Sequence, residues 1–381
     1  MKVLFVVNNA FAKGNGLSAS CRRTVKYLKE RGIDVRIMSG NGGGEGTPDY
    51  YLKDTKIPIF DGLIRKQGYS FSKNDTDLIK EAISWADVIH LEEPFFLQME
   101  TARLAKEAGK ALVSTYHLHP ENLFASIHLN KTKAINNATM RLWRDTVFNK
   151  CDIIQCPTEN VKERLIKWKF IPELRVISNG MLPSNKPFKE HQKSEDGTIT
   201  IVTSGRYSVE KDQITVLKAM KYSHYASKIR LILAGRGPLD KKLNKEADKL
   251  YKKGIVKYKP VFGFYSLEEL EKIYEKTDLY IHCAMIEVEG MSCMEAIQSG
   301  IVPLIAKGDI TATSQFALSQ KSVFKNRDAK ELASKIDYWI EHEEERKEEA
   351  KKYYGMGEKY HISKSIDALI QMYEDALKMH R

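Results

Sequence analysis

The sequence has few cysteines and no long apolar run, and each absence narrows the classes of protein to consider. The five cysteines among 381 residues are scattered, odd in number and without a CxxC pair, so neither a zinc site nor a disulfide framework is indicated. No stretch approaches the roughly 20 consecutive apolar residues of a membrane-spanning helix. The first apolar stretch, KVLFVVNN, lacks a basic lead and a cleavage site, which predicts a core strand rather than a signal peptide. We therefore expect a cytoplasmic protein.

Signatures of nucleic-acid binding are also absent. The formal net charge is +11, and most of this excess, about +8, falls in the first half of the chain. Neither zinc-finger spacing nor an aromatic-rich strand signature accompanies this charge, so we expect no nucleic-acid partner. A basic first half can instead attract an anionic membrane face or a phosphorylated acceptor, with an ordinary solvated surface as the alternative.

Short β-branched apolar runs alternate with amphipathic stretches along the whole chain, a pattern typical of parallel sheets covered by helices. The expected strands are Val3–Val7, Val35–Met38, Val88–Leu91, Ala111–Tyr116, Ile153–Cys156, Val176–Ile177, Leu231–Ala234, Val256–Val261, Leu279–Cys283 and Val302–Ile305. The expected helices of the first half are Ser18–Arg31, Thr76–Trp85, Leu97–Ala108, Lys133–Phe148 and Thr158–Lys167. We predict the α/β class.

A polar stretch with two prolines, PSNKPFKEHQKSEDG at residues 183–197, interrupts this alternation and predicts a linker between two domains. We expect two Rossmann-like, doubly wound domains that face a cleft. Ligands of such sheets bind outside the carboxyl ends of the strands. The predicted parts are an N-terminal domain at 1–182, the linker, a C-terminal nucleotide-binding domain at 198–355, and a last helix within 356–381 that packs back on the first domain.

The loop after the first strand, NNAFAKGNGLSAS, combines two glycines with a candidate helix start. Gly14 and Gly16 allow a close approach of the backbone to a ligand, and Ser18 is a candidate N-cap of the next helix. Free N–H groups at a helix start favour a phosphate. Gly14-x-Gly16-x-x-Ala19 also fits the dinucleotide fingerprint by letters. No acid ends the second strand to hold a ribose, however, and a plain flexible loop is a further alternative.

Two basic residues follow the apolar run TITIVTSG, residues 198–205, which is the strand expected to begin the second half. Arg206, in Ser204-Gly205-Arg206, and Lys211 lie five residues apart across a turn into a helix. Arg supplies a fixed fork of donors and Lys a mobile point charge, so the two can hold one anion such as a diphosphate. Ordinary surface residues are the alternative interpretation.

The segment EVEGMSCMEAIQSGIVP carries the strongest signal. It follows the apolar run Leu279–Cys283, and its two carboxylates are Glu287 and Glu295. Ser292-x-x-Glu295 fits a capping box that opens a short helix, and Gly300 fits the close of that helix. The cap explains Glu295 on structural grounds alone, whereas nothing structural requires Glu287.

His117 follows the strand Ala111–Tyr116 directly, which places it at a carboxyl end in the first domain. A lone histidine there is more often structural than functional. The doublet with His119 lacks a third ligand and does not indicate a metal site.

Taken together, these segments resemble the GT-B glycosyltransferases, and in particular the retaining family 4. The resemblance covers nearly the whole chain. The matching segments are Glu-x7-Glu at Glu287 and Glu295 with Ala296 and Gly300-x-x-Pro303, SGR-x4-K at Ser204 to Lys211, GxGP at Gly235 to Pro238, PNG as Ser178-Asn179-Gly180, and a tail with Tyr360 and Tyr373.

The resemblance implies roles in donor binding for residues of the second domain. Arg206 and Lys211 would hold the diphosphate of a nucleotide sugar, with uracil the usual base of the family. Glu295 would bind the ribose, and Glu287 the hydroxyls of the transferred hexose. The loop Gly290–Cys293 would offer backbone N–H groups to phosphate or sugar, and Gly290, Met291 and Ser292 are its expected donor-binding residues.

In the first domain the resemblance implies that Gly14 and Gly16 approach the diphosphate and that His117 lies near the sugar and the acceptor. This sequence departs from the family pattern twice. Val288-Glu289-Gly290 stands where an aromatic residue and a glycine are usual, and Asn15 separates the two glycines. Both departures concern the choice of donor.

The implied reaction needs no cofactor beyond the donor, which is a co-substrate. Cationic side chains and helix N-termini can stabilise the departing nucleoside diphosphate, so we expect metal-independent hexosyl transfer with retention of configuration. A glycosidase-type carboxylate pair is the rival chemistry, and it has no use for Arg206 and Lys211. A nucleotide-sugar sensor without transfer and an NAD-type oxidoreductase are the alternative functions.

The acceptor is the part least constrained by these motifs. Relatives of this type act in glycolipid or surface polysaccharide synthesis, and we expect a glycan or lipid-linked acceptor. The basic stretch 131–186, with apolar residues in it and just before it, would then form an amphipathic region that brings the protein to the inner membrane face as a peripheral protein. The apolar residues of that region are Leu123, Phe124, Ile127, Leu142, Trp143, Phe148 and Trp168, with core packing as the alternative.

Overall fold

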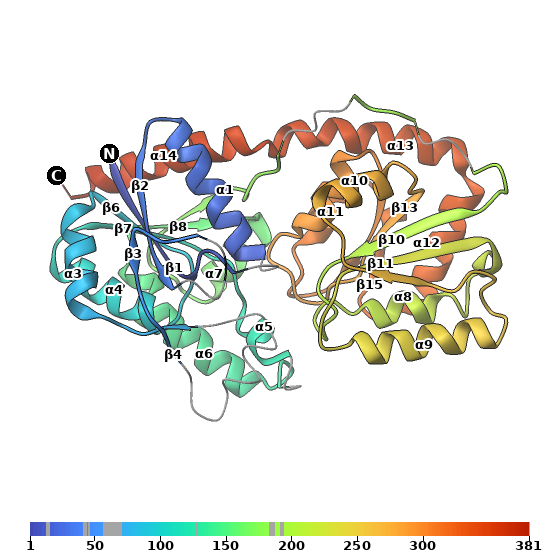
Figure 1. The fold of residues 1–381 in the computed structure, drawn as a ribbon, viewed down its shortest axis with the longest axis horizontal. Coiled ribbons are helices and arrows are strands. Elements are labelled where there is room, and N and C mark those ends of the chain that lie inside the picture. The colour runs from blue at the N-terminus through green and yellow to red at the C-terminus, as the bar shows by residue number, and fades with distance from the viewer. Residues whose placement is uncertain are drawn as a thin grey trace. The chain divides into compact units, whose positions relative to one another are not determined.

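The computed structural model describes residues 1–12, 16–40, 44, 46–55, 71–125, 129–182, 187–190 and 194–380. The chain forms two compact units (Figure 1). Unit 1 comprises Met1–Gly180 and Ile362–Arg381, and unit 2 comprises Met181–His361. The chain leaves unit 1 just before the predicted linker and returns to it at Ile362, a few residues after the boundary expected at 356.

Unit 1 is built on a parallel sheet of seven strands in the order β3-β2-β1-β6-β7-β8-β9. Its strands are β1 (Lys2–Asn9), β2 (Asp34–Gly40), β3 (Tyr50–Tyr51), β6 (Val88–Leu91), β7 (Ala111–Thr115), β8 (Ile153–Cys156) and β9 (Glu173–Val176). The order runs outward from β1 to β3 and then resumes at β6 on the other side of β1. The sheet therefore has a topological switch point between β1 and β6, where ligands of doubly wound sheets bind.

Helices flank this sheet. They are α1 (Gly16–Glu30), α3 (Thr76–Trp85), α4 (Phe96–Glu107), α5 (Pro120–Phe124), α6 (Lys133–Thr146), α7 (Glu159–Lys167) and α14 (Ile362–Lys378). A second, two-stranded antiparallel sheet consists of β4 (Asp54–Thr55) and β5 (Phe71–Ser72), and Ser72 bonds Asn8 and Gly40 at the ends of β1 and β2. Side-chain caps fix the N-termini of α3 and α7. Asp75 accepts a hydrogen bond from Leu78 N, and Thr158 accepts one from Val161 N.

Helix α14 completes the core of unit 1 although it comes from the end of the chain. Its apolar side chains Ile366, Leu369 and Met372 are buried in one cluster with residues of β1, such as Val3 and Phe5. These positions recur at the spacing of one helix face. The amphipathic pattern of the tail thus serves to cover the sheet of unit 1.

Unit 2 repeats the same architecture with six parallel strands in the order β12-β11-β10-β13-β14-β15. The strands are β10 (Ile199–Ser204), β11 (Ile229–Ala234), β12 (Val261–Gly263), β13 (Leu279–His282), β14 (Val302–Lys307) and β15 (Val323–Lys325). The order reverses at β10, so the switch point of this sheet lies between β10 and β13.

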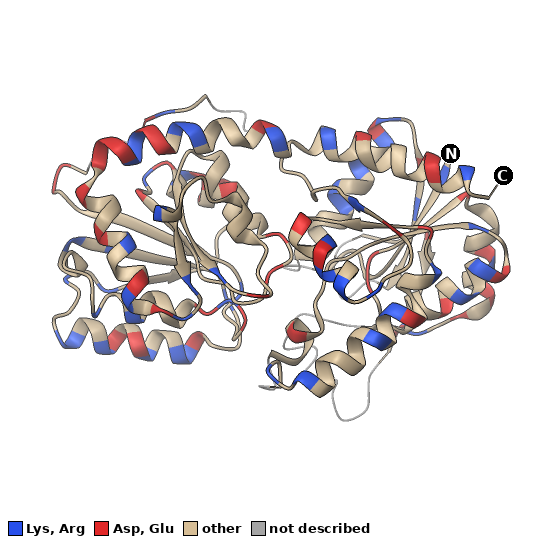
Figure 2. Cartoon of the chain, turned by 180° about the vertical axis from the view of Figure 1, so that it is seen from behind, with Lys and Arg blue, Asp and Glu red and all other residues tan. Residues whose placement is uncertain are grey.

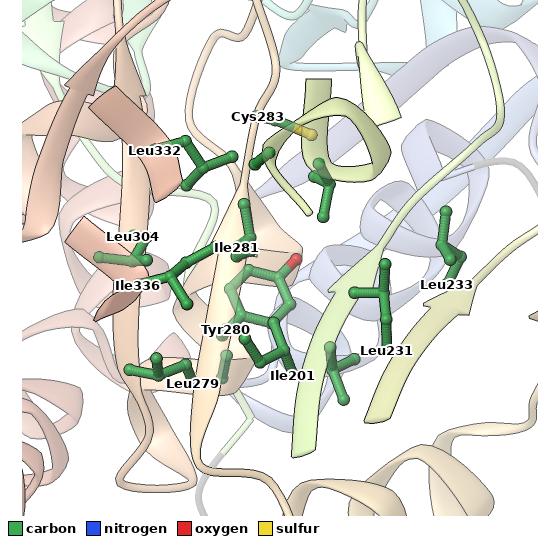
Figure 3. Close-up of a cluster of buried hydrophobic side chains, with 14 of the residues drawn as sticks. Ile201, Leu231, Leu233, Leu279, Tyr280, Ile281, Cys283, Leu304, Leu332 and Ile336 are labelled. Atoms are coloured by element: carbon green, nitrogen blue, oxygen red, sulfur yellow. The ribbon is translucent and has the colours of Figure 1, made fainter. Parts of the chain in front are cut away.

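The helices of unit 2 enclose an apolar core around the central strands. They are α8 (Gln213–Ala219), α9 (Asp240–Lys252), α10 (Leu267–Tyr274), α11 (Met291–Gln298), α12 (Ala329–Glu341) and α13 (Glu343–Met356). Figure 3 shows Ile281 and Tyr280 of β13 among side chains from neighbouring strands and from α12, including Ile336.

Two predicted strands were misplaced. One is Val176–Ile177, whereas β9 covers Glu173–Val176. The run Val256–Val261 was expected to be a strand, whereas β12 covers only Val261–Gly263. Val256 is buried in the core of unit 2 although it lies outside a strand, so core packing accounts for the start of that apolar run. In the part of the chain that the structure describes, no helix is long and apolar enough to cross a membrane.

Candidate functional site

The predicted donor residues of unit 2 come from the two loops at its switch point. Arg206 and Lys211 lie between β10 and α8, and Glu287 lies between β13 and α11. Because β10 and β13 pair in parallel, their carboxyl ends meet at the same edge of the sheet. Parallel pairing therefore brings together residues that are 76 positions apart in the sequence.

Lys211 and Glu287 form an ion pair, in which Lys211 Nζ donates to Glu287 Oε2. His282, the last residue of β13, places its Nε2 3.5 Å from the same oxygen. Burial acts to raise the pKa of Glu287, but the charge of Lys211 and the hydrogen bonding of His282 outweigh it and lower the pKa to about 2. Glu287 is therefore a carboxylate, available as an acceptor for hydroxyl groups.

Arg206 has a carboxylate partner of its own. Its Nη2 donates to Glu210 Oε1 at 2.7 Å, and Ser208 Oγ donates to the same oxygen at 2.5 Å. Gln213 Nε2 supports the loop by donating to the Arg206 carbonyl at 2.9 Å. Arg206 is half-buried while Glu210 is buried, so the carboxylate holds the guanidinium from the interior side.

The start of α11 differs from the prediction. Gly290, with φ of +93°, occupies the N-cap position and makes no side-chain cap. Ser292 is the second helical residue, and its hydroxyl accepts a hydrogen bond from Tyr280 at 3.0 Å. The predicted Ser292–Glu295 capping box is therefore wrong, because glycine at positive φ ends the loop one residue before Met291. Glu295 lies inside the helix and is half-buried, and Gly300 follows its end with φ of +73°.

Two glycines of the GxGP segment pack closely against the backbone of the loop that carries Arg206. A Cβ on Gly237 would lie 2.6 Å from the Tyr207 carbonyl oxygen, and a Cβ on Gly235 would collide with the Gly205 carbonyl. The backbones are also joined by hydrogen bonds, from Gly205 N to Ala234 O at 2.9 Å and from Tyr207 N to Arg236 O at 3.0 Å. Glycine is needed here for close approach of one backbone to another.

In unit 1, His117 lies two residues after β7 and is held by Glu92, the residue after β6. His117 Nε2 and Glu92 Oε2 are 2.8 Å apart, and Glu92 is only 4% exposed. Burial acts to raise the pKa of Glu92, but contact with His117 and then His90 lowers it below its ordinary value. His119, by contrast, turns away to bond Tyr116 at 3.1 Å, so the two histidines do not share a site.

Sequence reasoning missed Glu92, Glu93 and His90. Glu93 Oε2 accepts from Asn8 N at 2.6 Å and from Asn8 Nδ2 at 2.9 Å, which ties the carboxyl ends of β6 and β1 together. The signal was available for the two carboxylates, because Glu92 and Glu93 directly follow the apolar strand that His90 belongs to. Among the described residues, no group of three or more His, Cys, Asp or Glu is arranged to hold a metal ion.

The glycine loop is only partly described. Gly14 lies outside the described residues. Gly16 is the first residue of α1, and a Cβ there would meet nothing within 4 Å. Ser18 was predicted to be the N-cap, but it lies inside α1 and its hydroxyl donates to the Asn9 carbonyl, which links the helix to the end of β1.

Comparison with known proteins identifies the family. Residues 14–183 match the family described as Glycosyltransferase Family 4, and residues 184–355 match the family described as Glycosyl transferases group 1. The two matches together cover residues 14–355, so the chain belongs to these glycosyltransferase families. This membership gives no support to the dinucleotide interpretation of Gly14 and Gly16.

Two individual relatives of this glycosyltransferase are similar over only part of the chain. The alpha-monoglucosyldiacylglycerol synthase of Acholeplasma laidlawii is 24% identical over 262 residues, which cover 63% of this chain and 63% of that protein, so the chain spans less than two thirds of that relative. The catalytic domain of cholesterol-alpha-glucosyltransferase from Helicobacter pylori is 40% identical over 42% of this chain and 99% of that chain, with a TM-score of 0.38.

A third likeness concerns the fold of the whole glycosyltransferase. The structure of HepE from Anabaena, solved in complex with UDP and glucose, has a TM-score of 0.72 at 15% identity and covers 98% of this chain and 99% of that chain. Two Rossmann-like α/β units with parallel sheets are thus the GT-B fold in this protein.

Proposed function

We propose that this glycosyltransferase moves a hexose from a UDP-sugar to a glycan or glycolipid acceptor, with retention of configuration and without a metal ion. The observation that carries the proposal is the Lys211–Glu287 pair at the switch point of unit 2. It joins a cation suited to a diphosphate with a carboxylate suited to sugar hydroxyls. HepE, which shares the fold, was solved with UDP and glucose, and this supports the choice of donor.

In the proposed complex the donor diphosphate lies against Arg206, Lys211 and the N-terminus of α11. The free N–H groups of Met291 and Ser292 add a partial positive charge at that end of the helix. Both cations are already held in place by Glu210 and Glu287, so binding of the donor requires little ordering of these side chains. Glu295, in the same helix, is proposed to bind the ribose.

The proposed reaction breaks the bond between the anomeric carbon and the UDP oxygen and forms a bond from that carbon to an acceptor oxygen. Charge develops on the leaving diphosphate, and Arg206 and Lys211 stabilise it more in the transition state than in the ground state. The acceptor hydroxyl gives its proton to the departing phosphate on the same face of the sugar. Configuration is retained, and no protein base is required for this proton.

The proposal assigns hydroxyl recognition to Glu287. Its lowered pKa of about 2 keeps it ionised, so that it accepts hydrogen bonds from hydroxyls and does not donate. This protonation state suits sugar binding and disfavours the role of a general acid, which would require a raised pKa. The glycosidase-type reading of Glu287 and Glu295 therefore has no support from the electrostatics of Glu287.

A lipid-linked acceptor is the proposed choice among acceptors, because the curated relative acts as a glycosyldiacylglycerol synthase by its name. The proposed membrane contact is the exposed surface of α6, on which Lys133, Arg141 and Leu142 are each exposed. Along α6 the basic residues outnumber the single acid, Asp145 (Figure 2).

The structure corrects the composition of the predicted membrane face. Trp143 and Phe148 are each only 2% exposed and belong to the core of unit 1, whereas Leu142 is 52% exposed. Leu123, Phe124 and Trp168 are half-buried, and Ile127 lies outside the described residues. The proposed contact is therefore mainly electrostatic, with Leu142 as its apolar member on α6.

Release of nucleoside diphosphate tests the reaction. The wild type and Glu287→Ala are incubated with a panel of nucleotide sugars in the presence of EDTA. Slow release of UDP from one UDP-hexose by the wild type, lost in Glu287→Ala, is the expected result and names the donor. Folded protein that binds no nucleotide sugar would refute the proposal, and release only after metal is restored would refute metal independence.

Flotation with liposomes tests the membrane contact. The protein is expected to float with vesicles rich in anionic phospholipid at low salt and to lose this binding in Lys133→Glu/Arg141→Glu. Lys241→Glu/Lys245→Glu on α9 of unit 2 is the matched control, with the same change of charge. Binding that survives the α6 change or fails at low salt would contradict the proposed surface.

A further inference from the structure

A chain of hydrogen bonds crosses the interior of unit 1 and has a defined direction. Gln155 Nε2 donates to the Ile177 carbonyl at 2.9 Å, so its Oε1 is free to accept, and Thr115 Oγ1 donates to that oxygen at 2.7 Å. With its only proton committed, Thr115 must accept from His90 Nε2 at 2.7 Å. His90 therefore carries a proton on Nε2.

The other end of this chain is a residue of the C-terminal helix. His90 Nδ1 and the Tyr373 hydroxyl are 2.7 Å apart, and both side chains are fully buried. Burial lowers the pKa of His90 to about 4, so the imidazole is neutral and its Nδ1 accepts from Tyr373. Tyr373 of helix α14 thereby bonds the second ring nitrogen of a histidine in β6 and matches the tautomer that Thr115 requires.

Glu92 branches from this chain toward His117. Its Oε1 is 3.3 Å from His90 Nε2, which already carries the proton, and its Oε2 is 2.8 Å from His117 Nε2. An ionised carboxylate has no proton to donate, so His117 Nε2 must be the donor. His117 Nδ1 is left without a hydrogen-bond partner among the described residues.

The surroundings of this pair are polar. Glu92 and His117 line a small pocket together with Ser20, Thr24, Ser178 and Asn179. A neutral imidazole with its proton on Nε2 presents a lone pair at Nδ1, the arrangement that accepts a hydrogen bond from a hydroxyl.

We propose that Glu92 is a positioning residue, which holds His117 in the Nε2–H tautomer so that Nδ1 accepts a hydrogen bond from a hydroxyl of the transferred sugar or of the acceptor. Tyr373 of α14 supports this arrangement by orienting His90 against Glu92. The inference rests on the proposed function, because it assumes that His117 meets a hydroxyl-bearing substrate.

The isosteric change Glu92→Gln has a specific consequence. His90 Nε2–H donates to Thr115 at 2.7 Å and has Glu92 Oε1 at 3.3 Å as a second, longer acceptor, so it favours the amide oxygen at that end of the side chain. The amide NH2 is then turned toward His117 Nε2, which must accept instead of donate. The proton of His117 consequently moves to Nδ1, so the atom offered to substrate becomes a donor.

Long-range 1H–15N spectra of histidine-labelled full-length protein, recorded near pH 8, report this tautomer directly. His117→Asn assigns the signal. The wild type is expected to show the Nε2–H form and Glu92→Gln an increased share of the Nδ1–H form. Glu93→Gln, which makes the same change one residue later at a carboxylate bonded to Asn8, is expected to leave the signal unchanged.

A Nδ1–H tautomer in the wild type would overturn the proposal without any variant. An unchanged His117 signal in folded Glu92→Gln would overturn it as well. A purely structural role for Glu92 predicts lowered stability with the same tautomer, so the spectra separate the two roles.

Steady-state kinetics supply the second readout. Glu92→Gln is expected to lower kcat about tenfold or more while KM for the donor changes about twofold or less, because the donor diphosphate is held elsewhere. A rise in KM for the donor with an unchanged kcat would contradict a positioning role. If the wild type transfers no sugar from any donor, the proposed function fails, whereas the tautomer result stands or falls independently.

Discussion

Lys211 donates a hydrogen bond to Glu287, and these two residues of unit 2 come from loops that follow neighbouring strands. One is the cation assigned to the donor diphosphate and the other is the carboxylate assigned to the sugar. Their pairing means that neither side chain can be changed without altering the charge state or position of the other.

Lys211→Met should lower the free energy of unfolding near pH 7 by about 1–3 kcal/mol, because Glu287, with 16% of its side chain exposed, loses the charge that compensates its burial. Lys211→Met/Glu287→Gln should recover part of this loss, since it leaves no unpaired charge. Urea denaturation of both variants and of Glu287→Gln measures the coupling. Strict additivity of the two single changes would contradict the pairing.

The same pair gives a pH dependence with a defined sign. The pKa of Glu287 is lowered from an ordinary value of 4.5 to about 2, so its stabilising contribution is complete above pH 4.5 and is lost as the pH falls toward 2. In Lys211→Met the main opposing charge is gone and this part of the acid dependence should disappear. The difference in urea midpoint between the wild type and Lys211→Met should therefore shrink as the pH is lowered through this window.

His90 predicts a second pH effect, in unit 1. Its pKa falls from 6.5 to about 4 because the folded protein buries it, so the unfolded chain binds the proton first as the pH is lowered. Stability from this group is complete above pH 6.5 and is lost toward pH 4, by at most about 3 kcal/mol. Unfolding of unit 1 followed by tryptophan fluorescence should report this loss of stability, since Trp85, Trp143 and Trp168 all lie in unit 1.

His90→Gln should be less stable than the wild type near pH 7 but should show a flatter pH dependence between pH 6.5 and 4. His342→Gln is the control, because His342 is exposed in unit 2 and its loss should leave the slope unchanged. An equal slope in the wild type and His90→Gln would show that another group governs stability in this range.

Gly237→Ala should disturb donor binding through the backbone of the Arg206 loop. The added Cβ would lie 2.6 Å from the Tyr207 carbonyl oxygen and 2.8 Å from its nitrogen, so the loop must move. We expect at least about a tenfold loss of donor affinity by calorimetry, as misplacement of a charged contact commonly costs. Gly355→Ala, in the last turn of α13, where a Cβ would meet nothing within 4 Å, should instead be neutral or stabilise the protein by up to about 1 kcal/mol.

Two serine variants test whether Ser292 caps the start of α11. Ser266 is a genuine N-cap of α10, accepting from Glu269 N at 3.3 Å, so Ser266→Ala should speed amide exchange at Glu269. Ser292→Ala should leave exchange at Glu295 unchanged, because Ser292 bonds Tyr280 rather than the helix backbone. Faster exchange at Glu295 in Ser292→Ala would restore the capping box.

Local patterns in the sequence were sufficient to place Arg206, Lys211, Glu287 and His117 after the ends of strands. Strand periodicity is a property of neighbouring residues, so the β10, β13 and β7 loops could be recognised without knowledge of the fold. The same locality explains two of the errors. Val256 reads as part of a strand because it is apolar, although it packs outside one, and Ser292 fits a cap by spacing alone.

The sequence by itself determined the α/β class, the family resemblance and the loops that carry the candidate site, because each of these depends on short-range patterns. Only the tertiary structure decided which residues touch. Strand order joins Lys211 to Glu287 across 76 positions, and the docking of α14 joins Tyr373 to His90 across 283. Such contacts depend on which elements pack together, and no local pattern of side chains encodes that choice.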